Sequence, residues 1–146
     1  MRREGKQLGF ADHFVAQSGS ARGDWLIEVD RLVDWAAVDR LLEPIHAAPR
    51  GRPGYAPLVL LKAALLQRWH ALSDEEAEHA IGDRLSFRRF LGLPLEAKTP
   101  DHVTLWRFRQ ELAQRGLAPA VFAEIGRQLA GRGMIVREAR SSTPRW

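Results

Sequence analysis

The sequence predicts an all-α fold, a five- to six-helix orthogonal bundle with flexible termini. Apolar residues recur at three- and four-residue steps, which is the spacing of one helix face. Serine or aspartate stands where several helices should begin, and glycine stands where they should end. Hydrophobic residues make up 45% of 146 residues, enough for the core of one domain. We expect that domain over residues 24–133, after a Gly-, Ser- and Arg-rich lead-in at 1–23.

The first two expected helices flank a loop. The first covers about 24–47, although Pro44 weakens its end. Residues 49–57 contain three prolines and two glycines, so they predict a loop. The second helix runs from Pro57 to about Ala71 and is apolar on most sides, which places it at the centre of the core.

Capping signals mark the third and fourth helices. Ser73 and Glu76 have the spacing of a capping box, and the helix behind them should reach about Leu85. Ser86 is then expected to cap a short fourth helix, which Gly92 ends.

Two longer helices follow the loop at 93–99. The fifth is predicted from Asp101 to Arg115 and the sixth from near Pro119 to Gly131–Gly133. Residues 134–136 could begin a strand, and the last residues look like a loose tail.

Composition excludes several kinds of chemistry. The chain has no cysteine, so disulfides, thiolate metal sites and thiol catalysis are absent. No histidine pair has zinc-ligand spacing, and the acidic cluster at 74–78 is explained by capping behind Ser73. The most apolar stretch, Pro57 to Leu66, is too short to cross a bilayer, and no signal peptide is visible. We therefore expect a cytoplasmic protein without a cofactor or a membrane partner.

Charge is divided along the chain. Residues 23–47 carry two basic and six acidic residues, a net of −4, whereas residues 84–115 carry seven basic and three acidic residues, a net of +4. The basic segment holds the fourth and fifth helices, which resemble a helix-turn-helix pair with an unusually long turn. A basic helix pair of this kind suggests double-stranded DNA as a partner. Basic residues on an exposed helix face can also simply contact water.

The fifth helix would present a polar side. If Leu105, Phe108 and Leu112 point inward, the opposite side shows Val103, Trp106, Arg107, Gln110 and Gln114. Arg107 could bond guanine and Gln110 adenine. Trp106 could touch DNA or fill a gap between helices. The expected phosphate contacts are Arg88, Arg89 and Arg109.

Three motifs carry a family resemblance. They are Leu72-Ser-Asp-Glu75, Ser86-Phe-Arg-Arg-Phe-Leu-Gly-Leu93 and Pro100-Asp-His-Val-Thr-Leu-Trp-Arg-Phe-Arg109. In this order, they resemble the N-terminal domain of insertion-sequence DDE transposases of the IS-five type. The resemblance covers about residues 24–138 and implies binding to the terminal inverted repeats of the element. Thr104, within the third motif, is also among the expected DNA-binding residues.

The resemblance also implies a catalytic domain downstream, with an Asp-Asp-Glu triad that holds divalent metals. The first aspartate is expected soon after Glu138, but the sequence continues Ala139-Arg-Ser-Ser-Thr-Pro-Arg-Trp146. We expect residues 134–146 to be a remnant of that domain's start. The chain would then be a truncated copy or half of a split reading frame, without catalytic activity or a metal of its own.

Two alternatives remain open at this stage. The acidic first helix and apolar second helix could pair with another copy or with an intact transposase, which makes the chain an interaction module. Alternatively, the chain is a decayed fragment that is unstable without its lost domain.

Overall fold

The computed structural model describes residues 21–48 and 54–133, with side chains from Trp25 onward. These ranges are all-helical, as predicted, and contain eight helices and no strand. The helices are α2 (Ala21–Leu32), α3 (Trp35–Leu41), α4 (Glu43–Ala47), α5 (Pro57–His70), α6 (Asp74–Asp83), α7 (Leu85–Leu91), α8 (His102–Gln114) and α9 (Ala118–Gly131).

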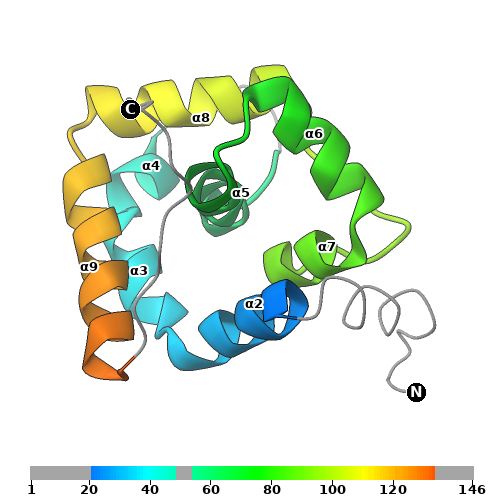
Figure 1. The fold of residues 1–146 in the computed structure, drawn as a ribbon. Coiled ribbons are helices and arrows are strands. Elements are labelled where there is room, and N and C mark those ends of the chain that lie inside the picture. Colours follow the sequence, from blue (N-terminus) through cyan, green and yellow to red (C-terminus); the bar gives the residue numbers. More distant parts are fainter. Residues whose placement is uncertain (1–20, 49–53, 134–146) are drawn as a thin grey trace.

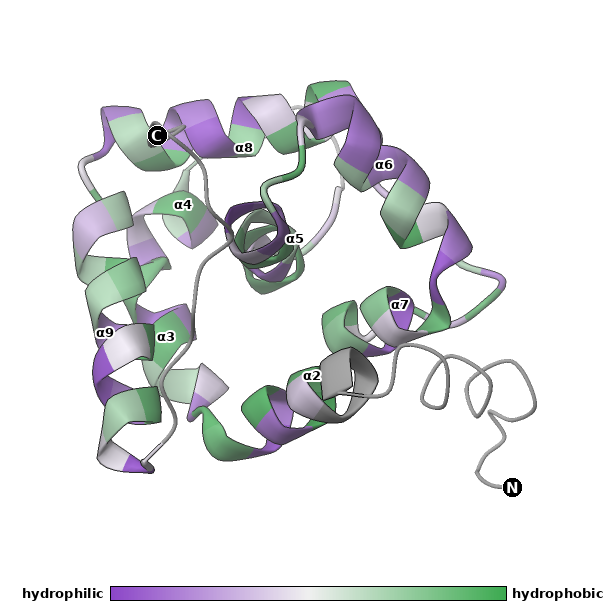
Figure 2. Ribbon diagram, viewed as in Figure 1, coloured by the Kyte–Doolittle hydropathy of each residue, from purple (hydrophilic) through white to green (hydrophobic). Residues whose placement is uncertain are grey.

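Helix α5 is the central helix of the bundle. Figure 1 shows it end-on, with the other helices arranged around it. Its apolar residues are buried on several sides, including Leu61 and Leu66, which have no exposed surface. The surrounding helices carry both hydrophobic and hydrophilic segments, as amphipathic helices do (Figure 2). This arrangement confirms the central position predicted from the sequence.

A buried lysine joins three helices. Lys62 of α5 is 9% exposed, and its ammonium donates to Asp30 Oδ1 of α2 at 2.8 Å and to the Phe90 carbonyl of α7 at 2.9 Å. The same ammonium lies 4.5 Å from the centre of the Trp35 ring. These partners compensate for removing a charge from water, because a buried charge without partners would be strongly unfavourable.

The first expected helix is three helices, which raises the number above the predicted five to six. Asp34 has extended backbone geometry and accepts a hydrogen bond from the Ala37 amide, so it ends one helix and begins the next. A second break lies at Leu42, and Pro44 is in the first turn of α4. Proline has no amide hydrogen to continue the ladder, which explains why a new helix starts there.

The capping box at Ser73 is confirmed. The Glu76 amide donates to Ser73 Oγ at 3.0 Å, and the Ser73 amide donates to Glu76 Oε1 at 2.8 Å. The predicted cap at Ser86 is wrong, because Arg84 is the N-cap of α7 and Ser86 lies buried inside that helix. Apolar burial of the segment around Ser86 outweighs the preference of serine for a helix end.

The predicted ends of the last helices are close to the observed ones. Asp101 caps α8 by accepting from the Thr104 amide at 2.8 Å. Gly116 follows α8 with a positive φ of 67°. Helix α2 begins within the lead-in predicted at 1–23. Residues 1–20 and 134–146, which include the predicted strand and tail, lie outside the described residues.

Candidate nucleic-acid interface

Helix α8 packs with the orientation that the sequence predicted. Leu105, Phe108 and Leu112 are 2%, 4% and 1% exposed, so they form its inner side. Its main neighbours are α5 and α6. At about 100° per residue, the opposite side of the helix must then face away from the bundle.

The outer face of α8 consists of five residues with exposed side chains. Val103 and Trp106 are 41% and 50% exposed, and the face is completed by Arg107, Gln110 and Gln114. At about 1.5 Å per residue, the five cover about 16 Å of helix. The face contains no carboxylate, and within the described ranges no side-chain hydrogen bond or ion pair is found for any of the five residues. Its one cation and two amides are therefore available to an external partner.

Helix α6 holds α8 through two polar contacts. Arg109 Nη2 donates to Asp74 Oδ1 at 2.8 Å and to Asp74 Oδ2 at 2.7 Å. The His102 amide and ring Nδ1–H donate to Glu78 Oε1 at 2.9 and 2.7 Å. The hydrogen bond with His102 lowers the pKa of Glu78 below 4.5, and that with Glu78 raises the pKa of His102 above 6.5. Both contacts fix the outer face relative to the bundle.

Asp74 also contacts α5. Gln67 Nε2 donates to Asp74 Oδ1 at 2.9 Å, so one carboxylate joins α5, α6 and α8. The sequence interpretation assigned Asp74 only to helix capping. No local signal identifies its partner Arg109, because the two residues are 35 positions apart.

Two of the arginines expected to hold phosphates have partners within the chain. Arg109 is in the ion pair with Asp74, and its side chain is 14% exposed. Arg88 Nη1 donates to the carbonyls of Pro94, Leu95 and Ala97, which ties down the loop before α8. Both arginines therefore stabilise the surroundings of α8.

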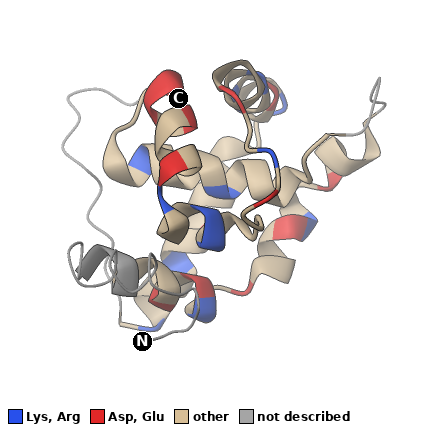
Figure 3. Ribbon diagram, turned by 90° about the vertical axis from the view of Figure 1, so that its right-hand side faces the viewer, with Lys and Arg blue, Asp and Glu red and all other residues tan. Residues whose placement is uncertain are grey.

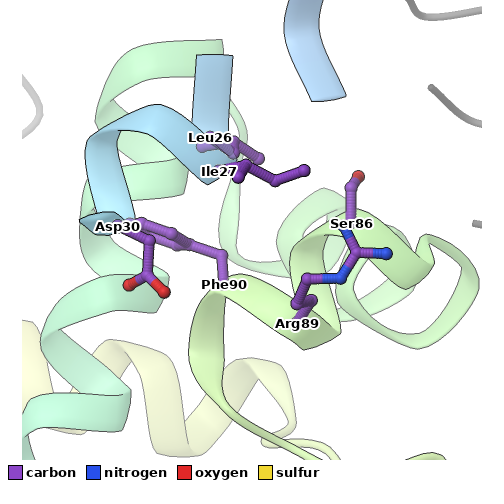
Figure 4. A pocket seen from close by; sticks show the side chains of 6 residues that line it. All are labelled: Leu26, Ile27, Asp30, Ser86, Arg89 and Phe90. Atoms are coloured by element: carbon purple, nitrogen blue, oxygen red, sulfur yellow. The ribbon is translucent and has the colours of Figure 1, made fainter. Parts of the chain in front are cut away.

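Arg89, the third of these arginines, lies on another side of the bundle. It lines a small pocket between α2 and α7, beside Ile27 and Ser86 (Figure 4). Burial lowers the pKa of its guanidinium below the ordinary value. Arg88 and Arg89 both belong to α7, which is not among the main neighbours of α8.

The remaining expected residues are close together on α8. Trp106, Arg107 and Gln110 share the outer face, whereas Thr104 is partly buried on its flank. Helix α8 packs on α5 and α6, whereas α7 packs against α2, α5 and α6. The expected fourth and fifth helices correspond to α7 and α8. The sequence predicted that these two pack as a pair, but α6 packs against α8 in place of α7.

The electrostatic pattern is mixed outside this face. Viewed from the side of α6 and α7, basic and acidic residues alternate over the helices (Figure 3). The described residues contain no group of three or more His, Cys, Asp or Glu that could hold a metal ion. None of the described helices is long and apolar enough to cross a membrane.

Comparison with known families decides the identity of the domain. The family model described as Transposase domain (DUF772) matches residues 14–111. The chain belongs to this transposase domain family. The match includes α2 to α7 and most of α8, and therefore most of the outer face. It does not specify the IS-five type that the motifs resemble, and no solved structure matches the chain.

Proposed function

We propose that this transposase domain binds double-stranded DNA through the outer face of α8 and recognises the terminal inverted repeats of an insertion sequence. The supporting observation is that Leu105, Phe108 and Leu112 are buried while a carboxylate-free face points outward. Family membership supports a role in transposition. The proposal assigns binding and no catalysis to the chain, and it implies a cytoplasmic, nucleoid-associated location.

The face has side chains suited to the major groove, which admits one α-helix. Arg107 can donate two hydrogen bonds to guanine O6 and N7, and Gln110 can bond adenine N6 and N7. The two residues are three positions apart, about 4.5 Å along the axis, which is close to the 3.4 Å between base pairs. They are therefore proposed to read neighbouring base pairs.

Binding to DNA also needs side chains that contact phosphates. Lys98 is exposed in the loop before α8 and is a better candidate than Arg88 or Arg109, which have internal partners. Phosphate contacts by Arg88, Arg89 and Arg109 stay predictions, and a base or phosphate contact by Thr104 does as well.

The experiment is selection from a pool of randomised duplexes, followed by anisotropy titration of the enriched sequence with the full chain. We expect affinity to fall linearly with salt on a double-logarithmic plot, because bound phosphates release counterions. Arg107→Ala and Gln110→Ala should each weaken binding to the enriched duplex about 5- to 150-fold. Arg40→Ala is the matched control, because Arg40 is exposed on α3.

Three results would contradict the proposal. They are failure to enrich any sequence, binding that is insensitive to salt, and equal losses for Arg107→Ala and Arg40→Ala.

Two observations bear on the alternatives that the sequence left open. The apolar second helix, α5, is covered by this chain's own helices, so the interaction hypothesis would have to rely on the acidic first helix, 24–47. A decayed fragment should expose apolar helix faces that its lost partner once covered. Among the described residues, the exposed large hydrophobics are only Ile27, Leu95, Val103 and Trp106.

A further inference from the structure

The outer face of α8 contains two apolar side chains that base hydrogen bonding leaves unexplained. Val103 and Trp106 are 41% and 50% exposed, and both lie beside the residues proposed to read guanine and adenine. Val103 is four positions before Arg107, so it lies on the same side of the helix, about 6 Å away along the axis. Trp106 has the same relation to Gln110.

The pair is too small to form a stable protein interface by itself. A large aromatic side chain buries at most about 250 Å², whereas a specific protein interface buries about 800 Å² on each partner. The neighbours of the pair on this face are a cation and two amides, which do not extend an apolar patch. A partner that presents isolated apolar groups beside polar acceptors matches this face better than a protein surface does.

The DNA major groove has that combination. Each thymine presents a 5-methyl group there, beside the hydrogen-bonding edges of the neighbouring bases, and apolar side chains contact it. A distance of about 6 Å along the helix axis corresponds to about two base-pair steps of 3.4 Å. The apolar residues and the base readers can therefore contact one continuous sequence.

We propose that Val103 and Trp106 are specificity-determining residues that contact thymine methyl groups. The bound site then contains a T·A pair within two base pairs of the guanine that Arg107 contacts. This inference rests on the proposed DNA binding by α8, and it adds a feature of the recognised sequence that hydrogen bonding by Arg107 and Gln110 does not require.

Replacement of thymine by uracil tests the inference, because uracil differs from thymine only by the missing 5-methyl group. The probe is the duplex enriched by selection, synthesised once with thymine and once with uracil at every T·A pair within two base pairs of the G·C pair that Arg107 senses. The full chain is titrated against both duplexes at one salt concentration. Binding to the uracil duplex should be about fourfold weaker for each methyl group contacted.

The variants identify the side chains responsible. Val103→Ala and Trp106→Ala should each weaken binding to the thymine duplex and reduce the thymine-to-uracil ratio towards one. Ile27→Ala is the matched control, because Ile27 is an equally exposed apolar residue on α2 at 45% exposure. It should leave the ratio unchanged. Circular dichroism of each variant reports whether the fold is retained, and Val103→Ala removes too little buried surface to unfold the domain.

The outcomes separate this inference from the proposed function. Equal, salt-dependent binding to the thymine and uracil duplexes would overturn the methyl contacts and leave DNA binding by α8 intact. A thymine preference that persists in both variants would also overturn them, because other residues would then sense the methyl groups. Absence of binding to either duplex would overturn both proposals.

Discussion

Replacement of Asp74 by alanine should loosen the attachment of α8 to the bundle. The Asp74 carboxylate accepts hydrogen bonds from Gln67 Nε2 at 2.9 Å and from Arg109 Nη2 at 2.7 and 2.8 Å. The side chains of Arg109 and Asp74 are only 14% and 16% exposed. Removing one partner of a buried ion pair costs about 3–5 kcal/mol. Because some solvent reaches this pair, we expect a loss of about 2–4 kcal/mol in the free energy of unfolding.

Urea denaturation followed by circular dichroism measures this loss. The expected fall in the transition midpoint is about 1–2 M. Glu75→Ala is the matched control, because Glu75 is exposed in the same first turn of α6. Both substitutions remove one negative charge near the positive end of the helix dipole, so their difference isolates the contacts of Asp74. Glu75→Ala should change stability by less than about 1 kcal/mol.

A double-mutant cycle checks the pairing itself. Once Asp74 is alanine, Arg109→Met should cost much less than it does in the wild type, because the ion pair is already lost. If Asp74→Ala is as stable as Glu75→Ala, Asp74 does not hold α8, and our explanation of how the outer face is positioned fails.

Three further predictions concern neighbouring features. The raised pKa of His102 and the lowered pKa of Glu78 mean that their ion pair stabilises the fold most between pH 4.5 and 6.5 and less as pH rises through the pKa of His102. The urea midpoint of His102→Gln should therefore differ more from wild type near about pH 5.5 than near about pH 8.5, and a constant difference would disprove the pairing. Arg88→Met should speed amide hydrogen exchange in loop 93–99, measured by mass spectrometry; unchanged protection would show that the three carbonyl contacts do not order the loop. Gly92→Ala should cost about 1 kcal/mol in urea denaturation from its positive φ of 78° alone, since a Cβ there meets no atom within 4 Å, and a much larger loss would indicate a clash.

Local signals predicted much of the fold. The capping box at Ser73, the cap at Asp101 and the glycine at Gly92 each act within a few residues, so the sequence shows them directly. The interruption at Asp34 was missed because the apolar repeat continues through it. Its amide donates to Gln128 Oε1 of α9 at 2.7 Å, a contact 94 positions away that no local pattern reveals.

Part of the candidate interface could also be predicted from local signals. The buried side of α8 follows from apolar spacing, so the exposure of Arg107 and Gln110 could be deduced from the sequence. The internal partners of Arg88 and Arg109 could not be deduced, because basic residues that order a loop or pair with another helix look like solvated ones in a sequence. Net charge along a segment overestimates the cations that an external partner can reach.

Chemical-shift mapping tests the central claim, DNA binding by the outer face of α8, most directly. Backbone amides of ¹⁵N-labelled full chain are followed while the enriched duplex is added. We predict that the largest shifts fall on α8 around Val103, Arg107 and Gln110, with small shifts along α2 and α9. Shifts concentrated on α2 or α9, with α8 unchanged, would contradict this claim.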